Sequence, residues 1–471
     1  MKHITRALVV LGTAAVVALP SLPSFAATAK AGAKCRKVGE VVGALTCTQK
    51  GKSRIYVKAA AAPATTAPVA GATAATTAAP AAGLATVPGF DGKTITIGYL
   101  GNVAASPQFP SSAFFADGGK SLTAGYNAYI ARINDAGGIA GKYKINVVFK
   151  ETYYDVGEAT KAYTDVKDKV VMIGQIYGTP LMQALSKPLL QDNLIATPIS
   201  LDAAWLRDPS ALPVGGTYQA QAINLIDYYL KEGGGAGKKI CSVALNSAYG
   251  LAGEEGFEFA LKDLKFTSGP KIKWSSADAV MGQMKSEKCD AIVATISGEL
   301  HTPSMISSGA KIDYTPTILA LGPSFASKTV VPSNSEAFGK QVITIGDGTQ
   351  WGDESVPGMK QHMADLRKYA PEQINVPNPA TEWGYTQAQT VVALLEKGVA
   401  NNDLSRAGLK KAMDTLGKVD TGGMFAQWTY GPVATRSAPS DNVMYKVDLS
   451  SRGALTAIKP YNSKSAQAYK P

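Results

Sequence analysis

The fold of this chain is decided by the stretch Thr94-Ile95-Thr96-Ile97-Gly98-Tyr99-Leu100, which ends at Gly101-Asn102 and leads into a helical pattern over 122–136 that stops at Gly137-Gly138. The first part is rich in β-branched residues and predicts a strand. The second part carries apolar residues at helical spacing and predicts a helix closed by a glycine stop. A strand followed by a helix is the repeating unit of a parallel α/β sheet.

The same alternation continues along the chain. Further strands are predicted at 145–150, 170–174, 194–198, 240–245, 291–296, 317–321 and 341–345, and helices between them at 157–168, 181–190, 220–231, 253–264, 279–286 and 359–369. This pattern predicts an α/β fold with doubly wound parallel sheets, in which ligands bind at the carboxyl ends of the strands. Because about 370 residues of it exceed the usual size of one sheet, two lobes are expected.

Composition limits the possible partners. The 471 residues are 45% hydrophobic and 18% charged, which allows a large buried core. Lys and Arg (47) outnumber Asp and Glu (36), so the formal net charge is +11. No long basic run accompanies this excess, and nucleic-acid binding is therefore not expected.

The N-terminus has the parts of a secretory signal peptide. Lys2 and Arg6 precede an apolar stretch, 7–19, and Ser24-Phe25-Ala26 places small residues where a signal peptidase cleaves. We expect cleavage after Ala26, so that 1–26 is removed and the mature chain is exported to the periplasm or the cell exterior. An uncleaved anchor is the alternative. Since no cysteine lies at the cleavage site, the protein is not expected to be a lipoprotein.

Two segments of distinct composition follow the signal peptide. Residues 27–58 are basic and carry two cysteines among glycines and β-branched residues, which predicts a small disulfide-closed β-hairpin. The basic residues of 34–54 are candidates for contact with an anionic cell envelope, and the alternative is a solvated spacer. Residues 59–90 carry no charge and consist mainly of Ala, Thr and Pro, which is typical of a disordered linker.

The four cysteines of an exported chain predict two disulfides. Cys35 and Cys47 are separated by the linker from Cys241 and Cys289, so pairing within each couple is favoured among the three possible connectivities. A buried pair of free thiols is the alternative for the second couple. No metal site is expected, because the chain has three histidines and one leaves with the signal peptide.

Several motifs occur in an order that resembles one protein family. They are Ile133-Asn134-Asp135-Ala136-Gly137-Gly138-Ile139-Ala140-Gly141-Lys142, Glu151-Thr152-Tyr153-Tyr154-Asp155, Ile173-Gly174, Thr197-Pro198-Ile199-Ser200, Ala248-Tyr249-Gly250, Gly384-Tyr385-Thr386-Gln387-Ala388 and Val419-Asp420-Thr421-Gly422-Gly423. From about Asp91 to Leu449 the chain resembles the type I periplasmic binding proteins of the branched-chain amino acid (leucine/isoleucine/valine-binding) family of ABC transporters.

This resemblance implies a Venus-flytrap receptor, in which two doubly wound lobes joined by three hinge crossovers close around a small solute. It places one lobe at 91–214 and 348–431 and the other at 215–347 and 432–460. The implied partner is the permease of an ABC importer, to which the receptor would deliver an amino acid or a related amide or aromatic compound. No cofactor is implied.

The expected ligand loops differ from those of the amino-acid-binding members. After the third strand, where those members typically carry small hydroxyl residues, this chain has Tyr177-Gly178-Thr179, and after the fourth it has Ile199-Ser200-Leu201. An α-amino acid would leave charges unpaired there, which is costly, so a flat or partly apolar solute is favoured. The candidate ligand-binding residues are Asn102, Phe109, Tyr177, Gly178, Thr179, Ile199, Ser200, Tyr249, Ser297, Glu299 and Trp351. Glu299 is a candidate partner for an ammonium group, whereas each aromatic residue could equally be ordinary packing.

An enzyme is not expected. The sequence has no Gly-x-Ser-x-Gly motif and no metal-ligand cluster, and the glycine-rich segment 233–239 precedes a predicted strand instead of following one, unlike a phosphate loop. Two hypotheses remain. One is a solute receptor of an importer, and the other is a cell-envelope adhesion or sensor protein that uses the same fold without transport.

Overall fold

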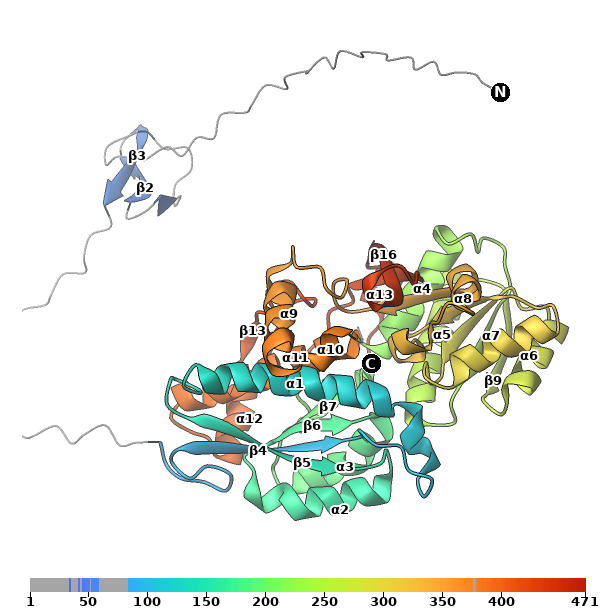
Figure 1. The fold of residues 1–471 in the computed structure, drawn as a ribbon. Helices are drawn as coiled ribbons and strands as arrows, with labels where there is room; N and C mark the ends of the chain where they lie inside the picture. Colours follow the sequence, from blue (N-terminus) through green and yellow to red (C-terminus); the bar gives the residue numbers. More distant parts are fainter. Residues whose placement is uncertain (1–33, 35–40, 43–44, 51, 59–83, 376–377) are drawn as a thin grey trace, which may run out of the picture. The chain divides into compact units, whose positions relative to one another are not determined.

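The computed structural model describes residues 34, 41–42, 45–50, 52–58, 84–375 and 378–471 (Figure 1). The chain divides into two compact units, Met1–Ala78 and Ala79–Pro471. The expected signal peptide, Cys35 and most of the expected linker (59–83) lie outside the described residues.

The first unit contains the predicted hairpin. Strands β2 (Leu45–Lys50) and β3 (Ser53–Lys58) pair antiparallel, and β1 (Val41–Val42) adds a third strand beside β2. Cys47 is buried in β2 and is disulfide-bonded, while its expected partner is outside the described residues.

The first lobe of the second unit is built on a parallel sheet with the strand order β5-β4-β6-β7. Its strands are β4 (Thr94–Gly101), β5 (Lys144–Glu151), β6 (Ile173–Tyr177) and β7 (Ala196–Ile199). Its helices and other elements are α1 (Ala116–Asp135), α2 (Val156–Val166), α3 (Thr179–Gln191), α9 (Pro357–Tyr369), α10 (Glu372–Asn375), α11 (Ala380–Ala400), α12 (Arg406–Asp414), β13 (Gly417–Val419) and β14 (Trp428–Tyr430). Figure 1 shows α1 and α11 on one face of the sheet and α2 and α3 on the other. Because α11 comes from late in the chain, this lobe is assembled from two separate segments.

The second lobe is built on a seven-stranded sheet with the order β16-β15-β12-β11-β10-β8-β9. The strands are β8 (Ile240–Ala244), β9 (Ser268–Lys273), β10 (Ala291–Thr295), β11 (Thr317–Ala320), β12 (Val342–Gly346), β15 (Asn442–Val447) and β16 (Leu455–Tyr461). The helices are α4 (Tyr218–Lys231), α5 (Ala248–Leu264), α6 (Ala277–Ser286), α7 (His301–Lys311), α8 (Ser335–Gln341) and α13 (Lys464–Ala468). Strands β8 to β12 run parallel, and β15 and β16 join antiparallel. No helix in the described part of the chain has the length and apolar character that a membrane crossing requires.

Side-chain caps begin several helices. The Asp155 carboxylate accepts from the Glu158 amide at α2, and the Ser247 hydroxyl accepts from the Gly250 amide at α5. Such caps satisfy amides that have no partner within the helix. Helix α1 follows Phe115 and helix α11 follows Pro379, and neither residue provides a side-chain cap. Both uncapped helix starts lie at the candidate site described below.

The predicted strands and helices are present, with shifted ends. Helix α1 begins at Ala116, earlier than the expected 122. Its Gly119 passes the carbonyl oxygen of Asn102 so closely that a Cβ atom would collide, so this glycine serves packing and does not interrupt the helix. Strand β6 begins at Ile173, later than expected. Phe90, which we assigned to the linker, is buried against Tyr143 and belongs to the folded body.

The Cys241–Cys289 disulfide is confirmed. Cys241 lies in β8 and Cys289 just before β10, which is the neighbour of β8 in the sheet. The alternative of two free thiols is therefore wrong.

Candidate functional site

A cavity of about 200 Å³ lies between the two lobes. The ends of β6 and β7 supply Tyr177 and Ile199 from the first lobe, and the start of α5 supplies Tyr249 from the second. The aromatic lining residues are Phe115, Tyr154, Tyr177, Tyr218, Tyr249, Phe325, Trp351, Trp383 and Tyr445. A concave, mainly apolar lining with a few polar groups is typical of a site for a small molecule.

Most of the predicted ligand residues lie on this cavity. They are Tyr177, Gly178, Thr179, Ile199, Tyr249, Glu299 and Trp351. They come from strand ends and crossovers, where a doubly wound sheet binds its ligands. Their contact with a ligand stays a prediction.

The other predicted residues are outside the cavity lining. Asn102 and Ser297 are fully buried and donate hydrogen bonds to backbone carbonyls. Ser200 hydrogen-bonds to Thr179 and to an indole N–H. Phe109 stacks on a tyrosine ring of the first lobe, with 5.2 Å between ring centroids. The Asn102 amide nitrogen and the Ser200 and Ser297 hydroxyls are used within the fold, which sequence spacing does not reveal, while Asn102 Oδ1 has no hydrogen-bond partner among the described residues.

The polar ends of the main aromatic residues are also used within the fold. The Tyr177 hydroxyl donates to the Phe115 carbonyl at 3.0 Å, and the Tyr249 hydroxyl lies 2.9 Å from the Ser324 hydroxyl. Burial raises the pKa of both tyrosines well above the ordinary value, so both stay neutral. These rings therefore contribute mainly apolar surface to the cavity.

Several lining residues were not found from the sequence. They include Tyr154, Tyr218, Gln221, Asp347, Glu382, Trp383 and Tyr445. Asp347 lies at the expected second crossover, which could have singled it out. It accepts hydrogen bonds from Gln221 Nε2 at 3.0 Å and from Asn442 Nδ2, while burial raises its pKa to about 7. Glu382 and Trp383 directly precede the Gly384 motif, but nothing in the sequence directs them toward the opposite lobe.

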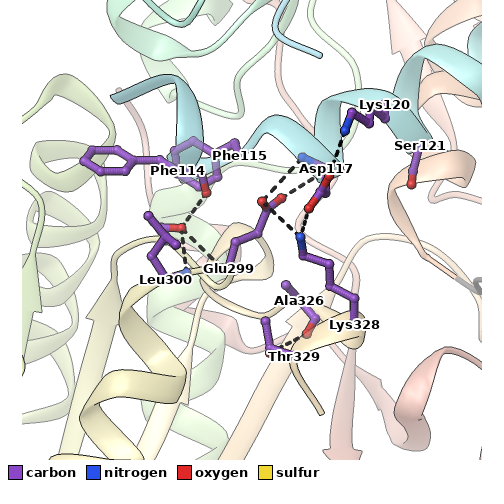
Figure 2. Close-up of polar contacts among 12 residues, drawn as sticks. Phe114, Phe115, Asp117, Lys120, Ser121, Glu299, Leu300, Ala326, Lys328 and Thr329 are labelled. Carbon is purple, nitrogen blue, oxygen red and sulfur yellow. Dashed lines mark hydrogen bonds and ion pairs between the residues drawn. The ribbon is translucent and has the colours of Figure 1, made fainter. Parts of the chain in front are cut away.

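Glu299 connects the two lobes (Figure 2). Its Oε1 accepts from the Gly118 amide at 2.7 Å, and its Oε2 lies 3.4 Å from the Asp117 amide. Both amides belong to the first turn of α1, which lacks a cap of its own. A carboxylate there satisfies free amides and interacts favourably with the helix dipole. Burial nevertheless raises the pKa of Glu299 to about 7, against the lowering effect of the Gly118 amide.

Further contacts join the lobes beside Glu299. Lys328 of the second lobe pairs with Asp117 of the first, and its Nζ lies 3.9 Å from Glu299 Oε2. The Phe114 ring contacts the His301 ring, with 5.2 Å between centroids. The structure is therefore closed around the cavity. Glu299, the candidate ammonium partner, uses its carboxylate in these contacts between the lobes.

Glu299→Ala is expected to shift the ligand-free protein toward an open form. The variant removes the acceptor of two α1 amides, which costs about 2 kcal/mol, or a roughly 30-fold change in the ratio of closed to open molecules. Small-angle X-ray scattering would record the opening as a larger radius of gyration. Glu287→Ala is the control, because it removes a carboxylate from a surface ion pair with Lys239 inside the second lobe. An unchanged radius for Glu299→Ala would contradict the interlobe role.

A family model described as periplasmic binding protein matches residues 94–453. The chain belongs to the periplasmic binding protein family. This family consists of exported solute-binding proteins rather than enzymes, and its members deliver small solutes to ABC transporter permeases. A search of curated proteins finds no match.

Solved structures share the fold of this periplasmic binding protein. A fatty acid ABC transporter substrate-binding protein from Thermomonospora curvata has a TM-score of 0.74 and 23% identity, covering 82% of this chain and 97% of its own. A branched-chain amino acid ABC transporter protein from Thermus thermophilus with bound valine has a TM-score of 0.68 and 13% identity, covering 80% and 98%. A branched-chain amino acid substrate-binding protein from Streptococcus pneumoniae, in complex with isoleucine, has a TM-score of 0.62 and 17% identity, covering 78% and 100%.

Proposed function

We propose that this periplasmic binding protein encloses a small solute between its lobes and delivers it to the permease of an ABC importer. The observation that carries the proposal is the cavity at the strand ends, which the Glu299 bond to α1 closes from the opposite lobe. Hinge closure around a ligand uses this arrangement. One lobe would comprise 91–214 and 348–431, and the other 215–347 and 432–460. The hinge would lie where the chain passes from one lobe to the other.

The lining favours an amino acid or a related amide or aromatic compound with a flat or apolar part. Tyr177, Tyr249 and Trp351 would contact that part, and Thr179 would contribute a polar group. The solved relatives bind valine and isoleucine or are named for fatty acids, so apolar ligand parts occur on this fold.

The mature protein would begin after Ala26 and act in the periplasm or at the cell exterior, without a lipid anchor. Contact of segment 34–54 with an anionic envelope stays a prediction without further support. The adhesion or sensor alternative also gains no support, because the comparisons name transporter components.

The test is native mass spectrometry of the mature chain, followed by a thermal-shift screen of amino acids, amides, aromatic acids and polyamines. A ligand at 100 times its Kd stabilises the folded state by about 2.7 kcal/mol, which raises the melting temperature. Tyr249→Ala should abolish that rise. Tyr228→Ala is the matched control, because Tyr228 is a buried tyrosine of the same lobe away from the cavity. No bound species and no shift with any class would contradict the proposal.

A further inference from the structure

We infer that Glu382 is the recognition residue for a protonated amine, so that the solute is an organic ammonium compound with a flat or apolar body. This inference rests on the proposed function and concerns the same cavity. It assigns the ammonium to the first turn of α11 and not to Glu299, the candidate named from the sequence.

Glu382 is a buried carboxyl group with an unused acceptor. It lines the cavity and is 3% exposed, and its Oε1 has no hydrogen-bond partner among the described residues. Its Oε2 lies against the second crossover, since a Cβ built on Gly348 would be 2.9 Å away. A buried acceptor without a donor is costly, and a ligand N–H can remove that cost.

The start of α11 explains why this oxygen is unpartnered. Glu382 is the third residue of the helix, a position from which a glutamate commonly accepts the backbone N–H of the residue that caps the helix. Here that residue is Pro379, which has no N–H. Because the sequence has proline at this position, the backbone N–H that would normally pair with Glu382 does not exist.

The other carboxylates on the cavity already have donors. Glu299 accepts from the first turn of α1, and Asp347 accepts from Gln221 and Asn442. Burial alone raises the pKa of Glu382 well above its ordinary range, and an ammonium at hydrogen-bond distance would oppose that shift. Among the carboxyl groups that line the described cavity, Glu382 alone has a buried oxygen without a hydrogen-bond partner.

The neighbouring residues suit an organic cation. Trp383, Trp351 and Tyr445 also line the cavity, and aromatic faces attract cations. The Tyr445 hydroxyl donates to the Gly348 carbonyl at 2.8 Å, so it is not the missing donor for Glu382. Arg452 is the cationic lining residue and is exposed. A ligand carboxylate would therefore have to pair with the exposed Arg452. It would not supply the hydrogen-bond donor that Glu382 lacks.

The experiment compares head groups on a constant body, using the mature protein. The probes are hexylamine, hexanol and hexanoate, and phenethylamine, phenethyl alcohol and hydrocinnamate, with affinity measured by calorimetry and melting temperature. We expect the amine of a series to bind most tightly. Glu382→Gln should weaken the amine roughly 30-fold or more and leave the alcohol nearly unchanged. Glu396→Gln makes the same change at an exposed position of the same helix and should leave both unchanged.

The outcomes separate the two proposals. Equal or tighter binding of alcohols or carboxylates, or unchanged amine affinity in Glu382→Gln, overturns the assignment of Glu382 and leaves the receptor function standing. If the amines fail to bind while another class in the thermal-shift screen binds, the assignment of Glu382 is also overturned and the receptor function stands. Failure of every class in both screens overturns the receptor function as well.

Discussion

Gly384→Ala is expected to lower the free energy of unfolding by about 3 kcal/mol, although alanine forms helices better than glycine. Gly384 lies where α11 crosses α1, and a Cβ atom there would collide with the carbonyl group of Leu122. Gly125 of α1 makes the reciprocal approach to the backbone of Thr381. Because backbone atoms cannot turn aside as side-chain ends can, the two helices would have to separate.

That separation would also reach the cavity. Glu382 and Trp383 precede Gly384 in the first turn of α11 and line the cavity. Ligand affinity should therefore fall together with stability. Gly125→Ala should have a similar effect, and the double variant should cost less than the sum, since both methyl groups widen the same gap.

Urea unfolding of each variant measures these costs. The matched control is Gly282→Ala, in α6, where an added Cβ meets no atom of the described residues within 4 Å. It should stabilise the protein by about 0.5–1 kcal/mol, because only helix propensity changes. A stabilising effect of Gly384→Ala would contradict the close helix contact.

The fold could be predicted from the sequence because its signals are local. The β-branched run of 94–100 and the helical spacing after it describe one strand and one helix without reference to distant residues. The same holds for β8 and β10 as single strands, whereas their pairing is a contact between distant segments that the alternation does not decide. Helix ends were less certain: the glycines at the start of α1 look like a loop but provide room for backbone contact.

The site could be predicted where it follows strand ends and crossovers. Tyr177 and Ile199 directly follow or end strands, so topology places them at the cavity. Glu382 reaches the cavity from a helix that packs on a sheet whose last strand, β7, ends at Ile199, and no local pattern encodes that contact. Glu299 lies on the cavity, but its bond to α1 depends on the approach of two lobes and not on sequence spacing.

Loss of the Cys241–Cys289 disulfide is expected to lower the free energy of unfolding of the α/β unit by about 4 kcal/mol. The bond spans 48 residues, and opening it gives the unfolded chain back the entropy of that loop. Both cysteines are buried within the second-lobe core. Reduced wild-type protein is therefore the sharpest comparison, because its thiols fill nearly the same space and only the covalent link is lost.

Calorimetry of oxidised and reduced protein, the latter unfolded and refolded in reductant, measures this difference as a drop in melting temperature. Cys241→Ala with Cys289→Ala should melt lower than the reduced protein, since it also leaves a cavity. Cys47→Ala is the control, because Cys47 lies in the separate first unit and should not change the melting of the second. A melting temperature that does not respond to reduction would show that the link adds nothing to the sheet. A large drop would mean that this receptor depends on the oxidising compartment to which its N-terminus is predicted to direct it.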